Sequence, residues 1–393
     1  MGERKKSPMR RSITDWLPDL EQHQSDYPWL ARHYTDIYQA LAEDIRYTYS
    51  AQDAIDAFKL IFQYAMTRPD FDKLQPLLYD GLFHARELKD FEAQMQIWLS
   101  LGHNNLYLGS LAEAETAFET AAYYEIERNS PDQLLLMNIG RLKTEALRQI
   151  VDEDVVWQSL DLASRVRNFS LVPTLYSTLA MAYLYVHKIQ QALGYGQMAY
   201  CGWYNEDNEV ELANCAFILA ETYRKADLLP QAARFVERAD HHLHLTDYPH
   251  KRASYRYQEG LQQLQAQNFA VAEIQLREAL AHLQKLPYSH LTAAAQHSLG
   301  LALTHTGKFQ EAREQLKAAF VFWCRLENWL EQANVFQALG YLAYRQGNNR
   351  RALRWYYAAL RRCGKANDSP SLERLRRDIR LSIEDLEQNS TEG

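Results

Sequence analysis

Small residues recur through this chain at a spacing of 40 residues. Gly260, Gly300 and Gly340 stand 40 residues apart. Two further positions of the same frame hold Ala272, Ala312 and Ala352, and Ala279, Ala319 and Ala359. A small side chain lets two helices approach to about 8–10 Å where they cross. The period therefore predicts a row of helical hairpins, each of which buries its apolar face against the next.

The same frame continues toward the N-terminus. Ala180 and Ala220 take the glycine position, so five units begin near residues 173, 213, 253, 293 and 333. The unit at 293–332 carries the pattern most fully: it places a turn at Gly307 between two apolar helices. A degenerate unit near 133 keeps Gly140, but its apolar residues Val156, Leu160 and Ala163 come four residues late.

An earlier stretch, WLSLG at 98–102, is followed by Gly109, Ala114, Phe118 and Ala121. On these residues the chain resembles the tetratricopeptide repeat (TPR) family, whose pattern is W-x2-L-G and then A-x3-F. Asn105 replaces the expected Tyr, and the period exceeds the family's usual length of about 34. The resemblance covers residues 95 to about 365. It implies an all-α fold: a right-handed superhelical α-solenoid of about seven hairpins at 91–366, the first of them near residue 95.

The two ends of the chain differ from this frame. Residues 1–12 are polar and basic and predict a disordered arm. Residues 13–90 predict a helical bundle or cap, with helices at 14–22, 27–48, 52–67 and 70–88, the last opened by Pro69. Residues 367–393 predict a capping helix that begins after Asp368, and a frayed tail from Glu387. Its apolar stripe is Leu372, Leu375, Ile379, Ile383 and Leu386. We expect one continuous body.

Composition narrows the class of protein. No run of 18 apolar residues exists, and the N-terminus has no apolar segment of a secretion signal. We therefore expect a cytoplasmic protein without a membrane span. Cys201, Cys215, Cys324 and Cys363 lie far apart and form no CxxC pair, which argues against both a disulfide framework and a zinc ribbon.

Charge is unevenly distributed. The chain has a net charge of −7, yet residues 332–367 contain seven Lys and Arg and no acid. Within this stretch Arg350, Arg354 and Arg361 share one helical face, while Tyr356 falls on a core position. A solvated outer face is the simplest interpretation. Contact with an acidic protein, or with RNA or DNA through interleaved Arg and aromatic residues, stays an alternative.

Motifs for chemistry are weak. Gly194, Gly196 and Ala199 spell G-x-G-x-x-A, but they follow a predicted helix where a dinucleotide site needs a strand. A His and Asp cluster could bind a metal, but we interpret it as solvated loop side chains: Asp240, His241, His242, His244 and Asp247. No HExxH, GxSxG or P-loop occurs. We predict no catalytic residue, metal or cofactor.

The TPR resemblance implies a concave groove lined by the first helix of each hairpin. Transferred position by position, it gives ten candidate partner-binding residues: Asn214, Arg224, Lys225, Tyr257, His297, His305, Asn334, Gln337, Tyr341 and Arg345. Amides can pair with a peptide main chain, tyrosines can cover its side chains, and cations can bind a carboxylate. The alternative is that each is an ordinary polar residue of the groove.

Three functions follow as hypotheses. The leading one is a non-catalytic adaptor that binds a segment of a protein or peptide partner, including one with acidic groups. The second is a peptide- or ligand-gated regulator, because a helical region of about 80 residues ahead of TPR units resembles the layout of bacterial peptide-sensing regulators. The third is RNA or DNA binding through the basic C-terminal repeat. The sequence predicts no oligomeric state.

Overall fold

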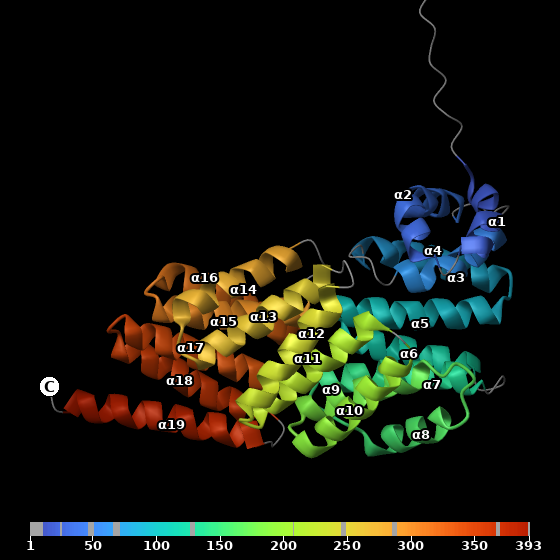
Figure 1. Cartoon of the computed structure of the whole chain (residues 1–393). Helices are drawn as coiled ribbons and strands as arrows, with labels where there is room; N and C mark the ends of the chain where they lie inside the picture. The colour runs from blue at the N-terminus through green and yellow to red at the C-terminus, as the bar shows by residue number, and fades with distance from the viewer. Residues whose placement is uncertain are drawn as a thin grey trace, which may run out of the picture. The chain divides into compact units, whose positions relative to one another are not determined.

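The computed structural model describes residues 11–23, 26–45, 51–65, 71–125, 130–206, 208–244, 249–284, 289–366 and 370–391. In these ranges the regular structure consists of nineteen helices (Figure 1). They are α1 (Ile13–His23), α2 (Tyr27–Asp44), α3 (Ala51–Ala65), α4 (Phe71–Glu87), α5 (Phe91–Leu108), α6 (Leu111–Glu125), α7 (Pro131–Leu147), α8 (Glu153–Ala163), α9 (Leu171–Tyr185), α10 (Ile189–Asn205), α11 (Glu209–Lys225), α12 (Leu229–His244), α13 (Pro249–Gln265), α14 (Phe269–Leu283), α15 (His290–His305), α16 (Phe309–Arg325), α17 (Trp329–Arg345), α18 (Asn349–Cys363) and α19 (Pro370–Thr391). The all-α prediction is confirmed.

The chain divides into two compact units. The first unit comprises residues 1–108 and 112–130, and the second comprises 109–111 and 131–393. None of the helices in the described ranges combines the length and apolar character that crossing a membrane requires.

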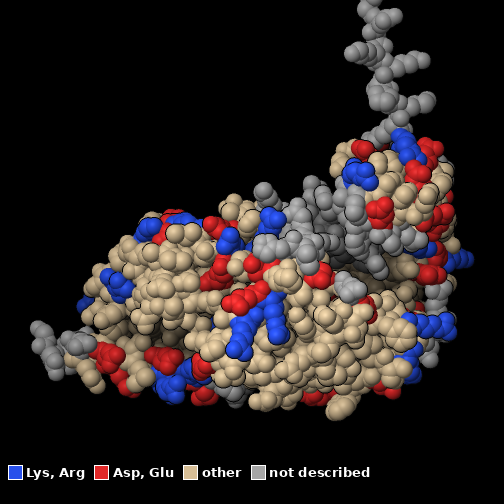
Figure 2. All heavy atoms as spheres, viewed as in Figure 1, with Lys and Arg blue, Asp and Glu red and all other residues tan. Residues whose placement is uncertain are grey.

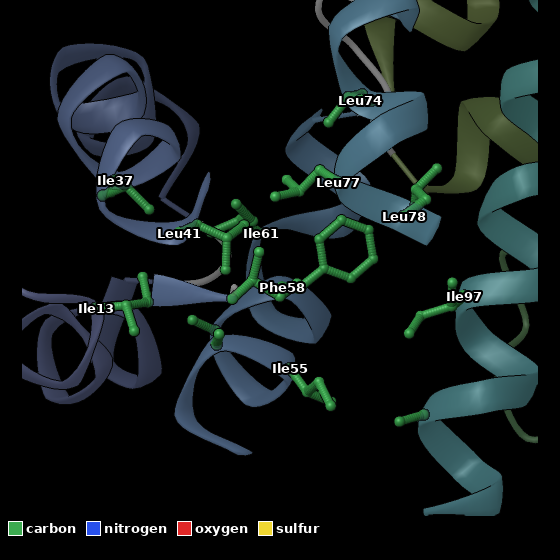
Figure 3. Close-up of a cluster of buried hydrophobic side chains, with 14 of the residues drawn as sticks. Ile13, Ile37, Leu41, Ile55, Phe58, Ile61, Leu74, Leu77, Leu78 and Ile97 are labelled. Atoms are coloured by element: carbon green, nitrogen blue, oxygen red, sulfur yellow. The ribbon is translucent and has the colours of Figure 1, made fainter. Parts of the chain in front are cut away.

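Large apolar side chains form the interior of the first unit. Phe58 of α3 lies between residues from the neighbouring helices, including Leu41 of α2, Leu77 of α4 and Ile97 of α5 (Figure 3). Ile13 of α1 belongs to the same cluster and is fully buried. These residues recur at helical spacing within α1 to α5, so each helix turns one apolar stripe toward a shared core.

The four helices predicted in the N-terminal region are confirmed, and most of their ends lie within a few residues of the predicted ones. The second is shorter than predicted, since it ends at Asp44 and not at residue 48. Pro69, Asp368 and the arm up to residue 10 lie outside the described residues.

Hairpins fill most of the second unit. They pair α9 with α10, α11 with α12, α13 with α14, α15 with α16, and α17 with α18 (Figure 1). The small residues stand where the two helices of a hairpin cross. A Cβ atom on Gly300 would lie 2.6 Å from Cγ of Leu316, and one on Gly260 would lie 2.6 Å from Cγ of Leu276. Glycine is therefore required there by close packing.

Gly340 and Gly102 obey the same rule. A Cβ atom on Gly340 would lie 2.5 Å from a ring carbon of Tyr356, and one on Gly102 of the first unit would lie 2.5 Å from a ring carbon of Phe118. In all four hairpins the residue that the added Cβ atom would meet lies 16 positions after the glycine. The predicted core position of Tyr356 is confirmed, since this residue is 4% exposed.

The turn inside each hairpin also repeats. Five residues 40 positions apart adopt a left-handed backbone: His187, Asp227, Gln267, Gly307 and Gly347, with φ of 59°, 58°, 60°, 82° and 75°. The amide after each donates to a carbonyl five residues earlier, as from Lys308 to Leu303 at 2.9 Å. This is the Schellman ending of a helix, in which a left-handed residue satisfies the last carbonyls.

The C-terminal helix α19 packs along α18 (Figure 1). Its predicted apolar stripe is confirmed: Leu372, Leu375, Ile379, Ile383 and Leu386 are all buried. The helix continues to Thr391, so the prediction of a frayed tail from Glu387 is wrong up to that residue. The Tyr357 hydroxyl donates to the Glu387 carboxylate at 2.8 Å and ties this part of α19 to α18.

The first helices of the hairpins form a continuous wall. Contacts join α7 to α9, α9 to α11, α11 to α13, α13 to α15 and α15 to α17. No comparable contact joins successive second helices, α10 through α18, in the part of the chain that the structure describes. Because the first helices stand closer together than the second, the stack curves with the first helices on its inside. We call their exposed sides the inner wall.

Candidate functional site

Two copies of one local motif place carboxylates on the inner wall. The Asn208 side chain caps α11 by accepting from the amide of Glu211, and Asn328 caps α17 by accepting from the amide of Glu331. One turn later Asn214 donates to Glu211 at 3.2 Å, and Asn334 donates to Glu331 at 3.2 Å. The motif is N-x-x-E-x-x-N, and its two copies lie 120 residues apart. Each cap fixes its helix start, and each later Asn orients the carboxylate.

An ion pair occupies the other end of α11. Arg224 donates to both oxygens of Glu221, with Nε at 2.8 Å from Oε2. The two side chains are 23% and 18% exposed, so they are neither core nor free surface. Burial opposes the charge on Glu221, but Arg224 outweighs it and the pKa of this carboxyl falls below its usual value. Gln258 of α13 adds to this lowering of the pKa of Glu221.

Charges on the inner wall act between distant helices. The charge of Glu331 on α17 influences Tyr185 of α9, Lys225 of α11 and Tyr257 of α13. Burial is the main cause that raises the pKa of both tyrosines, and the carboxylates add to it. Four successive first helices, α11, α13, α15 and α17, therefore bring one set of residues together. We call it the central cluster: Glu221, Arg224, Lys225, Tyr257, His297, Glu331 and Asn334.

Several groups of the inner wall lack direct partners. Lys225 and Lys143 form no salt bridge with any residue in the described ranges. Burial lowers the pKa of each, while a carboxylate opposes that change: Glu211 for Lys143, and Glu221 with Glu331 for Lys225. His297 Nε2 is buried and has no hydrogen-bond partner among the described residues, and burial lowers the pKa of this imidazole.

Aromatic rings form a second group at the ends of α15 and α17, which we call the rim cluster. The imidazole of His305 stacks on Phe269 with 3.7 Å between ring centroids and lies 5.1 Å from the ring of Tyr341. Arg345 donates to the Tyr341 hydroxyl at 3.1 Å. Burial and the neighbouring Arg345 lower the pKa of His305. The rim cluster offers flat apolar faces beside an exposed cation.

The ten predicted residues thus separate into groups. The central cluster contains Arg224, Lys225, Tyr257, His297 and Asn334, and the rim cluster contains His305, Tyr341 and Arg345. Asn214 lies apart, with Glu211. Gln337 is half-buried on α17.

Residue-by-residue transfer missed Glu331, Tyr185 and Lys143. The recurrence of N-x-x-E-x-x-N at 208 and 328 was the available signal for Glu331. The two others depend on how the first helices face each other, which no local pattern records.

The interpretation of the His and Asp cluster as solvated loop side chains is wrong for His242. His242 is 8% exposed and is not a solvated loop residue. Its ring, on α12, lies between Tyr200, whose hydroxyl is 2.8 Å from Nε2, and Glu209, whose carboxylate is 2.5 Å from Nδ1. It therefore links α10, α11 and α12. Asp247 lies outside the described residues, among which no group of His, Cys, Asp and Glu could hold a metal ion.

Two other motifs belong to helix packing or to the outer surface. Gly196 is inside α10, where a Cβ atom would lie 2.8 Å from Leu219, and Ala199 is fully buried. On α18 the predicted outer stripe of Arg350, Arg354 and Arg361 is exposed. Arg362 is instead half-buried, 5.2 Å from the ring centroid of Trp329. On the face shown in Figure 2, basic side chains gather over α11 and α12 next to acidic ones.

Comparison with known proteins identifies the fold. No protein-family model matches the sequence, and no curated protein matches it. Solved structures do match. A Rap protein complexed with competence and sporulation factor is 13% identical with a TM-score of 0.55, over 83% of this chain and 97% of that one. Aspartyl phosphate phosphatase F from Bacillus subtilis is 11% identical with a TM-score of 0.54, over 92% and 96%. The fold of the chain is therefore a TPR-like helical repeat.

Proposed function

We propose that the inner wall of the second unit binds an extended peptide segment of a partner protein, and that the chain is a non-catalytic, cytoplasmic adaptor. The observation that carries this proposal is the central cluster. Charged, amide and aromatic groups from four first helices face one another there, half-buried, and two of them, Lys225 and His297, lack direct partners among the described residues. Buried polar groups in proteins are usually hydrogen-bonded. Groups left open on a concave surface are therefore suited to a ligand.

A peptide matches the chemistry of these groups better than a compact molecule does. Asn334 uses one amide hydrogen for Glu331, and its carbonyl and second hydrogen can pair with a peptide main chain. Tyr257 and Tyr341 supply apolar faces for peptide side chains, and the cations can bind a carboxylate. Because these residues recur along successive helices, an extended segment can contact several of them at once.

A second candidate is a peptide-gated regulator. It is favoured by the likeness to the Rap protein complexed with competence and sporulation factor, which extends over 97% of that chain. A regulator should change shape when its peptide binds, whereas an adaptor need not. Small-angle X-ray scattering with and without the bound segment separates the two: a change in the radius of gyration supports the regulator. The similar protein aspartyl phosphate phosphatase F is an enzyme. A phosphatase assay of this chain therefore tests whether it is catalytic.

The binding proposal is tested in two steps. The partner is captured with the whole chain, identified by mass spectrometry, and its binding segment is synthesised. Calorimetric titration then compares wild type with Asn334→Ala and Arg345→Ala. Loss of one hydrogen-bonding group should weaken binding by about 1–3 kcal/mol.

Arg351→Ala is the matched control, because Arg351 is exposed on α18, a second helix of a hairpin. It should leave affinity nearly unchanged. Binding that survives both inner-wall substitutions and is lost in Arg351→Ala would contradict the proposal and would place the site on the basic outer face.

A further inference from the structure

A cleft of about 390 Å³ lies where helices α14, α15 and α16 come together. Buried leucines form its apolar part and glutamine amides form its polar part: Leu280, Leu283, Leu299, Gln284, Gln296 and Gln315. The ten candidate residues of the inner wall do not line this cleft. It is therefore a second place, separate from the inner wall, where a ligand can bind.

The repeat shows what usually fills this space. The second helix of each hairpin packs against the next hairpin, at a place that we call a junction. Aromatic rings fill two of the junctions. Between α10 and the next hairpin, the ring centroids of Tyr200 and Phe235 lie 6.3 Å apart. Between α16 and the next hairpin, Phe336 stacks on Phe320 at 4.7 Å and lies 5.4 Å from Trp355.

The junction of α14 with α15 and α16 has no ring at these positions. Compared with the residues 40 positions later, it has Leu280 for Phe320, Leu283 for Trp323, Gln296 for Phe336 and Gln315 for Trp355. At the junction of α12 with α13 and α14, the positions of the two glutamines hold Arg256 and Gln275, which hydrogen-bond each other at 3.2 Å. The cleft is thus the space that aromatic side chains occupy in neighbouring hairpins.

The charged groups beside the cleft are already paired with one another. Arg277 donates to Glu273 at 3.0 Å and to Glu311 at 2.8 Å, and Lys308 donates to Glu273 at 2.6 Å. Two cations and two carboxylates therefore balance each other. A charged ligand would lose hydration here without gaining an ion of opposite charge. The glutamine amides, in contrast, can both donate and accept hydrogen bonds.

We propose that this cleft binds a small uncharged molecule that consists of an aromatic ring system with an amide-like hydrogen-bonding edge. The ring takes the space that Phe336 and Trp355 occupy at the next junction and packs on the buried leucines. The polar edge pairs with the amides of Gln296 and Gln315. The volume of the cleft falls within the range of small-molecule sites, about 300–1,000 Å³.

Three probes test this chemistry by ligand-observed NMR titration of the whole chain. Naphthalene-2-carboxamide has both the ring system and the amide edge. Naphthalene-2-carboxylate has the same rings with a charge, and acetamide has the edge without the rings. The naphthalene amide should bind about tenfold more tightly than the carboxylate, because the cleft offers no unpaired cation. Acetamide should not bind measurably, because it buries almost no apolar surface.

Variants assign the binding to the cleft. Gln315→Leu keeps the space but removes one amide, so it should weaken binding of the naphthalene amide by up to about tenfold. The double variant Gln296→Phe with Gln315→Trp restores the ring pair of the next junction. It should abolish binding and leave the denaturation midpoint no lower than that of wild type.

Two controls should bind the probe as wild type does. Gln310→Trp adds a ring on α16 at an exposed position outside the cleft. Asn334→Ala changes the inner wall, so it separates this site from the proposed peptide site.

Several results would overturn the inference and leave the proposed peptide binding intact. They are failure of the naphthalene amide to bind, equal binding of the amide and the carboxylate, or binding that persists in the double variant. A double variant that is folded but less stable than wild type would also overturn it, because the cleft would then not match the ring positions of the neighbouring hairpins.

Discussion

The core around α1 to α5 of the first unit is built from large side chains, whereas the helices of the hairpins in the second unit cross at small residues. Around Phe58 the first unit packs Ile, Leu and Phe residues into one shared core. In the second unit Gly260, Gly300 and Gly340 let one residue of the next helix reach the backbone. A shared core forms one closed interior. A repeated crossing forms a row of similar hairpins.

This difference decides where a binding surface can arise. Helices α1 to α5 turn their apolar stripes toward one another, so their outward faces are unrelated to each other. The first helices of the second unit stand side by side and present equivalent positions on one wall. The central cluster follows from that repetition. Packing by small residues thus positions the candidate site.

The largest expected effect is loss of the shared core in the first unit. Phe58→Ala should destabilise that unit by about 3–5 kcal/mol, because a buried ring leaves a cavity among Leu41, Leu77 and Ile97. Hydrogen exchange measured by mass spectrometry should increase in α1 to α5. Phe83→Ala is the control, since Phe83 is 61% exposed. Equal exchange in the two variants would mean that Phe58 is not central to this core.

The next effect tests the helix crossings of the second unit. Gly300→Ala places a Cβ atom 2.6 Å from Leu316 Cγ, and this overpacking should cost about 1–3 kcal/mol in urea denaturation. Gly194→Ala is the matched control inside another helix, where a Cβ atom meets nothing within 4 Å. It should stabilise the protein by up to about 1 kcal/mol, because alanine favours helix. Effects of the same sign would contradict the packing argument.

The sequence predicted the hairpins well because the signal for them is local and repeated. Gly300 and Leu316 are separated by one fixed interval within a hairpin, and the interval recurs. The candidate site was predicted only in part. Arg224, Tyr257 and Asn334 follow from repeat positions, but Lys143 acts on Glu211 from α7. That relation depends on the curvature of the stack, which small rotations between hairpins set and no short motif encodes.

A pH-dependent effect tests how strongly the first helices bury ionisable groups. Burial lowers the pKa of His290, at the start of α15, to about 4 from an ordinary value of 6.5. Between these two values the unfolded chain binds a proton that the native state does not, so stability falls as pH falls through this window. Between pH 7 and pH 5, the free energy of unfolding should therefore fall by about 1–2 kcal/mol less in His290→Gln than in wild type.

Denaturation midpoints at several pH values measure this effect. His241→Gln, which removes an exposed imidazole on α12, is the control for the loss of a histidine that is not buried. If His290→Gln loses as much stability between pH 7 and pH 5 as wild type does, this imidazole binds a proton equally in the folded and unfolded states.

The smallest effect exchanges residues between two equivalent turns. Gln267 and Gly307 are 40 positions apart and both adopt a left-handed backbone, with φ of 60° and 82°. This conformation costs an ordinary residue about 1–2 kcal/mol, and glycine nothing. Glycine also loses more conformational freedom on folding than other residues, and this loss offsets part of the stabilisation. Gln267→Gly should therefore stabilise the protein by about 0.5–1 kcal/mol, and Gly307→Gln should destabilise it by a similar amount.

The exchange isolates backbone strain from packing. A Cβ atom at 307 would meet nothing within 4 Å, and Gln267 is exposed, so both substitutions act at open positions of the turn. The double variant carries the same two residues in exchanged order and should return close to the wild-type midpoint, because distant sites add. If Gln267→Gly destabilises the protein, the glutamine side chain itself supports the turn. The repeated backbone would then be maintained by different means in neighbouring hairpins.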